Sequence, residues 1–209
     1  MSWANVVAPL AGYLIGSVPT AYLVARRRHG VDIREIGSGN VGGSNMRAVG
    51  GVWGTILVGV TDLVKGAVAV WAVLLLGLGE GTAGITGMAV VAGHNWPVWL
   101  GFRGGRGAAA TLGVLLVLFP LGFLWVLLFL AVGRPLQLVA VLHVVAVVSL
   151  SGLAVVVGEP ASMVWLLVAL ALLMVIKRLE ANQRFRVPTG TETSRRVLAN
   201  RLLLDRDQR

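Results

Sequence analysis

Apolar runs about 20 residues long and almost free of charge limit what this chain can fold into. A helix needs about 20 such residues to cross the hydrocarbon core of a bilayer. Only 13% of the 209 residues are charged, against roughly 25% in soluble domains, and the mean hydropathy is +0.83. We therefore expect an all-α integral membrane protein.

Six apolar runs are expected to form the membrane-crossing segments. They cover residues 6–25, 52–78, 82–98, 108–132, 136–157 and 161–176. The first run lacks a basic N-terminal region and a small-residue cleavage site, so we expect it to be retained and not removed as a signal peptide. It is interrupted by GSVP at residues 16–19. The fourth is broken by FPLG at residues 119–122, and it is one kinked span, two short spans or a re-entrant hairpin.

The distribution of basic residues decides among these alternatives. We take the polar loop over residues 30–51, which follows Arg26, Arg27 and Arg28, to be cytoplasmic. The tail from Lys177 holds nine Lys and Arg residues, and basic segments favour the cytoplasmic side. Both can be cytoplasmic only with an odd number of crossings, and dividing the fourth run at Pro120 gives about seven. Every Lys and Arg except Lys65 then lies on the cytoplasmic side. We expect an outside N-terminus, a polytopic domain over residues 1–180, and a basic cytoplasmic C-terminal tail over residues 181–209.

Charge and composition also narrow the function. The net charge of +9 is typical of cytoplasmic loops that face anionic lipid, so we expect membrane lipid as a partner and no nucleic acid. The absence of cysteine excludes disulfides and thiol catalysis. We see no cluster of metal ligands and no His-x4-Asp dyad, and we expect no metal or cofactor. Acyl or phosphoryl chemistry would then depend on positioning and charge neutralisation.

The densest functional signal is GHNWPVWLGFRGGRG at residues 93–107. Glycines let backbone N–H groups approach a ligand closely, and arginine forks match phosphate oxygens. His94 is a candidate hydrogen-bond donor or base. The loop is either a phosphate cradle or a positively charged membrane loop in which glycines only make the turn, with His94 capping a helix end.

A second polar stretch, GSGNVGGSNMR at residues 37–47, combines glycines with hydroxyl, amide and guanidinium groups. Such a loop can wrap a phosphorylated polyol, with Arg47 on the phosphate. Asp62 and Lys65 lie three residues apart in the second apolar run. Because isolated charges are costly at membrane depth, we expect them to pair with each other or to face a polar interior. His143 is expected to be a packed core residue.

In combination, these motifs resemble the bacterial PlsY family of acyl-phosphate-dependent glycerol-3-phosphate acyltransferases. The similarity runs from residues 16–19 to the tail through GVDIR at 30–34, GSGNVG at 37–42, Asp62-x-x-Lys65-Gly66, and residues 93–107 with ATLG at 110–113. It implies seven transmembrane helices and an active site on the cytoplasmic face of the bacterial inner membrane. The implied reaction transfers a fatty acyl group from acyl phosphate to the 1-hydroxyl of glycerol 3-phosphate. This gives lysophosphatidic acid for phospholipid synthesis, without acyl-CoA, acyl carrier protein or metal.

The resemblance also implies site residues. The expected catalytic residues are Ser38, Arg47 and Arg106, the last where the family has lysine. The expected substrate-binding residues are Gly37, Gly39, Asn40, Gly42, Asn45, His94, Gly104, Gly105, Gly107, Arg178 and Asn182. The first loop would hold glycerol 3-phosphate, and the second would hold the acyl-phosphate headgroup.

The family's third motif is altered in this chain. Its histidine is replaced by Arg178, and its asparagine by Ala181 unless Asn182 takes that place. Two alternatives therefore stay open. One is a divergent paralogue with another phosphorylated acceptor or without catalysis. The other is a small transporter of phosphorylated solutes, for which the Asp62 and Lys65 pair is the best support.

Overall fold

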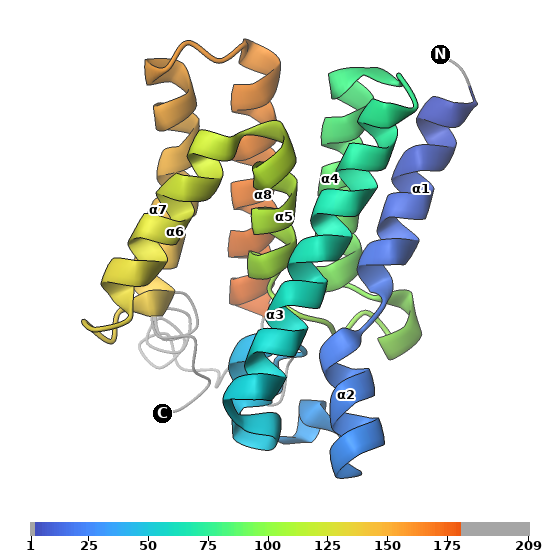
Figure 1. Ribbon diagram of the computed structural model, residues 1–209, viewed down its shortest axis with the longest axis vertical. Helices are drawn as coiled ribbons and strands as arrows, with labels where there is room; N and C mark the ends of the chain where they lie inside the picture. Colours follow the sequence, from blue (N-terminus) through green and yellow to red (C-terminus); the bar gives the residue numbers. More distant parts are fainter. Residues whose placement is uncertain (1–2, 181–209) are drawn as a thin grey trace, which may run out of the picture.

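A computed structural model describes residues 3–180 of the chain, and these residues form helices and connecting loops without any strand (Figure 1). Eight α-helices and two short 3₁₀ helices follow one another along the chain. They are α1 (Ala4–Ser17), α2 (Thr20–His29), η1 (Ile33–Glu35), α3 (Gly43–Leu75), α4 (Gly79–Asn95), η2 (Val98–Leu100), α5 (Ala108–Leu118), α6 (Pro120–Gly133), α7 (Val139–Val156) and α8 (Ala161–Glu180).

Four helical stretches are long and apolar enough to cross a membrane. They are Ala4–His29, Gly43–Leu75, Val139–Val156 and Ala161–Glu180. Two shorter apolar helices, α5 and α6, meet at Phe119 and Pro120, so the fourth apolar run is two helices and not one kinked span. Proline at the first position of α6 lacks the N–H that a continuous helix would need.

Two expected boundaries were wrong. The second run was expected to begin at residue 52, but α3 begins at Gly43, with a kink where Gly51 has φ 62° and ψ −153°. Residues 43–50 are therefore helical and not loop. The last helix was expected to end at residue 176, but α8 continues to Glu180 and includes Lys177 and Arg178, both of them buried.

The connections gather at two ends of the molecule (Figure 1). One end carries the α3–α4 turn and the α7–α8 turn, with Glu80 and Glu159. The other end carries the end of α2, the beginning of α3 and the α6–α7 turn. The Arg-rich segments therefore lie together, as the charge distribution predicted.

Glycines let two helix pairs cross backbone to backbone. Gly66 of α3 rests on the Ala110 carbonyl of α5, and Gly113 of α5 rests on the Leu63 carbonyl of α3. The α1–α4 crossing repeats this reciprocal arrangement, with Gly16 on Val90 and Gly93 on Tyr13. Small residues at such crossings allow close helix packing in membranes.

We predict that Gly113→Ala destabilises the protein by about 1–3 kcal/mol, because overpacking costs that much and backbone atoms cannot move aside. A Cβ at position 113 would lie 2.8 Å from Ala67 N. Gly152→Ala is the matched control, because a Cβ there meets nothing within 4 Å. Unfolding in mixed detergent micelles measures both variants, and equal stabilities would contradict the packing described here.

Candidate functional site

The first polar loop is held by its own side chains. Arg34 donates to both carboxylate oxygens of Asp32, at 3.0 Å from Nε to Oδ1 and 2.7 Å from NH2 to Oδ2. The side-chain hydrogen bonds from Arg34 hold the pKa of Asp32 below its ordinary 3.8. The stabilisation is therefore complete above that value and is lost only as the pH falls through the lowered pKa. This clamp stays ionised throughout the neutral range.

Asn45 fastens the same loop to α3. Its Nδ2 donates to the carbonyls of Ile33 at 3.0 Å and Ile36 at 2.9 Å, and its side chain is buried. Its two N–H groups are thus already in use, so an expected contact with substrate falls to Oδ1. Gly37, with φ 52°, lies against that oxygen.

Asn40 lies where the two polar loops meet. Its backbone N–H donates to Ser38 Oγ at 3.4 Å, and its Nδ2 donates to Ser44 Oγ at 3.2 Å. Its buried Oδ1 accepts no hydrogen bond within residues 3–180. The neighbouring Val41 N–H donates to the Gly104 carbonyl at 3.4 Å. The structure therefore brings Ser38, Asn40 and the second loop together.

The second loop folds back on the end of α4. Gly105 N–H donates to the His94 carbonyl at 2.9 Å, and Gly104 N–H donates to the Asn95 carbonyl at 3.2 Å. A Cβ at Gly104 would collide with the His94 carbonyl and with Pro97. A Cβ at Gly105 would collide with the His94 ring. Gly104 is therefore required by close backbone packing and Gly105 by the His94 side chain, whatever the loop binds.

Under this loop, three charged or titratable side chains from two helices form one buried cluster. Lys65 Nζ lies 2.9 Å from Asp62 Oδ1, which confirms the expected pairing, and 2.9 Å from His94 Nδ1. It also donates to the Val18 carbonyl at the break between α1 and α2, at 3.3 Å. The ammonium is thus hydrogen-bonded to Val18 and His94 and ion-paired with Asp62.

This arrangement fixes the tautomer of His94. Because Lys65 has only donors, His94 Nδ1 must accept, and its proton must lie on Nε2. The alternative, a bond from Nδ1 to Asp62 Oδ1, would span 3.6 Å, which is too long. The Nε2 edge of the ring faces Gly105. His94 therefore presents an N–H donor towards the glycine loop. Its contact with Lys65 was not predicted from the sequence.

Arg106 lies in this loop between two buried glycines, close enough to Lys177 of α8 for the two positive charges to interact. Lys177 is 1% exposed, lies 5.3 Å above the ring of Trp96, and pairs with Glu180 at 3.5 Å. Trp96 Nε1 in turn donates to Glu180 Oε2 at 2.6 Å. Sequence reasoning missed Lys177 because the apolar pattern ends at Ile176, although a lysine and a glutamate three residues apart are typical of a continuing helix.

Arg178, an expected substrate-binding residue, contacts α7 in the structure. Its NH1 donates to the Ala140 carbonyl at 2.9 Å, and its NH2 lies 3.5 Å from Nδ1 of the buried His143. It thus braces α8 against α7. Arg47 is exposed on the first turns of α3. Asn182 and the expected tail lie outside the described residues.

Two helix N-termini complete the site. Gly42 precedes α3 and Gly107 precedes α5, so each polar loop leads directly into the positive end of a helix. Unpaired N–H groups at such ends favour phosphate. Among residues 3–180 no group of His, Cys, Asp or Glu could hold a metal ion. The arrangement is chemically suited to bind two phosphate groups near a donor, His94 Nε2.

Comparison with known proteins agrees with this geometry. The family model described as glycerol-3-phosphate acyltransferase matches residues 6–186. The chain belongs to the glycerol-3-phosphate acyltransferase family. Glycerol-3-phosphate acyltransferase 5 of Dehalococcoides mccartyi is 37% identical over 215 residues, which cover 100% of this chain and 91% of that protein. The glycerol-3-phosphate acyltransferase of Parasynechococcus marenigrum is 39% identical over 183 residues, covering 87% and 85%.

Solved structures of this acyltransferase family share the fold. The crystal structure of PlsY (YgiH), described as an integral membrane glycerol 3-phosphate acyltransferase in its glycerol 3-phosphate form, has a TM-score of 0.77. It is 30% identical, over 85% of this chain and 89% of that one. The lysophosphatidic acid form has a TM-score of 0.74 at 29% identity. The chain is thus a multi-pass membrane protein, and none of these matches favours a different acceptor or transport.

Proposed function

We propose that this protein transfers a fatty acyl group from acyl phosphate to the 1-hydroxyl of glycerol 3-phosphate, giving lysophosphatidic acid. The observation that carries the proposal is the meeting of two glycine loops, through Val41 and Gly104, at the end of the molecule with the Arg-rich segments. We place this end on the cytoplasmic side of the bacterial inner membrane, with seven crossings and the N-terminus outside.

Each loop takes one substrate in this proposal. Ser38, Asn40, Asn45 Oδ1 and Arg47 hold glycerol 3-phosphate, with the glycines of residues 37–42 close to its oxygens. Gly104, Gly105 and Gly107 admit the acyl-phosphate headgroup to the beginning of α5, where Arg106 neutralises its charge. His94 Nε2 donates to an oxygen of that headgroup. Arg178 has an indirect role in this proposal: its bond to the Ala140 carbonyl holds α8 against α7.

The transfer needs no metal or cofactor. The glycerol hydroxyl oxygen attacks the acyl carbonyl carbon, the bond from that carbon to the phosphate oxygen breaks, and an ester forms. The hydroxyl proton passes to a substrate phosphate, because the loops offer arginines but no carboxylate in the proposed contacts. Inorganic phosphate leaves. Positioning and charge neutralisation supply the catalysis.

The acceptor side of the proposal is tested with palmitoyl phosphate and three acceptors: glycerol 3-phosphate, glycerol and dihydroxyacetone phosphate. We predict ester at the 1-hydroxyl of glycerol 3-phosphate, with a rate that rises as the acceptor phosphate ionises near a pKa of about 6. Asp32 does not titrate near pH 6, because its pKa is lowered below 3.8 by Arg34, so it does not contribute to this pH dependence. A faster reaction with either other acceptor would indicate the paralogue. A rate independent of phosphate ionisation would overturn the proton route.

A further inference from the structure

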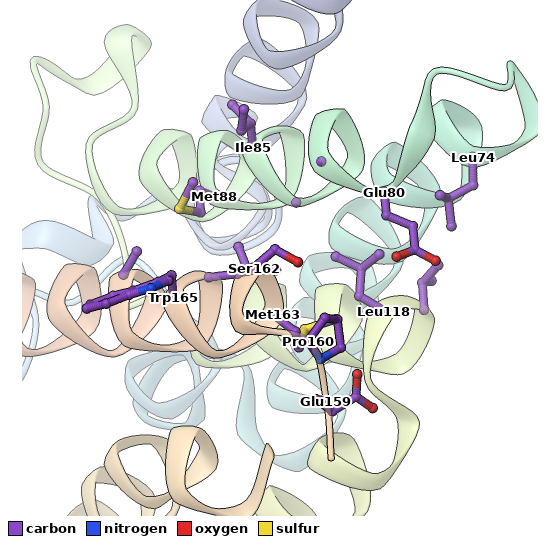
Figure 2. A pocket seen from close by; sticks show the side chains of 15 residues that line it. Leu74, Glu80, Ile85, Met88, Leu118, Glu159, Pro160, Ser162, Met163 and Trp165 are labelled. Carbon is purple, nitrogen blue, oxygen red and sulfur yellow. The ribbon is translucent and has the colours of Figure 1, made fainter. Parts of the chain in front are cut away.

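A cavity lies at the opposite end of the molecule from the two polar loops. It has a volume of about 610 Å³ and runs between α4 and α8, with the ends of α3 and α5 closing it (Figure 2). Its interior is apolar, with Met88 and Trp165 along its length and Leu118 and Met163 nearer the mouth. Volumes of 300–1,000 Å³ are typical of small-molecule sites.

The mouth of this groove is acidic. Glu80, in the first turn of α4, and Glu159, just before α8, both line it, and no Lys or Arg does. Within residues 3–180 neither carboxylate forms an ion pair or accepts a hydrogen bond from a side chain. An acyl-phosphate substrate would be repelled here, so the groove is not a continuation of the reaction site.

A positive end of a helix lies at the same mouth. The first turn of α8 begins at Ala161, and Ser162 lines the groove there (Figure 2). A helix N-terminus favours a phosphate group. The mouth thus offers two carboxylates for a cation beside a helix end and a hydroxyl for a phosphate, above an apolar groove.

We propose that this groove binds a membrane lipid whose headgroup carries both a phosphate and a primary amine, with one acyl chain lying between α4 and α8. The ammonium pairs with Glu80 and Glu159, and the phosphate lies at the beginning of α8. An anionic lipid without an amine fits the carboxylates poorly. This groove is separate from the reaction site. Lipid binding there does not depend on whether the acyl donor is acyl phosphate.

Trp165 makes the proposal measurable, because it lines the groove and is 71% exposed. The full chain is placed in phosphatidylglycerol vesicles that contain a small fraction of lipid with brominated acyl chains, which quench nearby tryptophan. The brominated lipid is phosphatidylethanolamine in one series and phosphatidylglycerol in the other. The fluorescence of the Trp165→Phe variant is subtracted from that of the parent, and the difference is the fluorescence of Trp165 alone.

We expect brominated phosphatidylethanolamine to quench Trp165 at about a fivefold lower fraction, as two exposed ion pairs imply. In Glu80→Gln/Glu159→Gln the two lipids should quench equally, while the acyl-transfer rate stays that of the parent. Equal quenching in the parent, or a preference that survives in the double variant, would overturn the proposal. So would shielding of Trp165 from both lipids in a dimer, since a second copy would then occupy the groove.

Discussion

Replacing Arg106 with alanine should lower the acyl-transfer rate by about 100- to 1000-fold, which is the usual cost of removing one preorganised group that stabilises developing charge. Arg106 lies between two buried glycines at the beginning of α5, and Lys177 adds a second positive charge nearby. The substitution removes the one cation of the loop that the resemblance places on the reacting phosphate. Initial rates with purified protein in detergent measure the effect.

Arg103→Ala is the matched control for this prediction. Arg103 stands three residues earlier in the same loop but is exposed to solvent, so we expect little change in rate. Arg106→Lys keeps the charge in the family's own form, and we expect it to retain most of the activity. Equal losses at positions 103 and 106 would show that general loop charge, and not the position of Arg106, matters.

Replacing Lys65 with methionine should destabilise the protein by about 3–5 kcal/mol, because breaking a buried ion pair leaves one charge uncompensated. Asp62 is 3% exposed, and its ammonium partner would be gone. The Val18 carbonyl at the break between α1 and α2 would lose its donor as well. Unfolding in mixed micelles gives the change in free energy.

A double variant separates the structural effect from the effect on the site. Asp62→Leu/Lys65→Met removes both charges, and replacing a buried pair with apolar residues often restores stability. We expect stability to recover but activity to stay low, because His94 would no longer be fixed with its proton on Nε2. Full activity in a stable double variant would show that the cluster does not position His94.

The sequence predicted the helical fold well, because uncharged runs of this length have few alternatives in a membrane. It also predicted the division at Pro120, since charge distribution and proline geometry agree there. It failed at the beginning of α3, because glycine, serine and asparagine at residues 42–45 are typical of a loop. In the structure Asn45 instead bonds to η1 and the helix passes through a glycine kink at Gly51.

The sequence motifs indicated which residues belong to the candidate site, but not which of them contact one another. Ser38, Asn40 and the glycine loop could be singled out because each belongs to a recognisable motif, but their meeting through Val41 and Gly104 is seen only in the structure. The contact of Lys65 with His94 joins residues 29 positions apart on different helices, so it depends on the crossing of α3 and α4 and leaves no local pattern. The contact of Arg178 with α7 was unforeseen for the same reason.

The most direct test of the central claim is the identity of the acyl donor. Purified protein with labelled glycerol 3-phosphate is given either palmitoyl phosphate or palmitoyl-CoA, and labelled lysophosphatidic acid is measured. We predict product with palmitoyl phosphate only. Product with palmitoyl-CoA alone would contradict the assigned donor. Folded protein that binds glycerol 3-phosphate but forms no product with either donor would contradict the proposed acyl transfer.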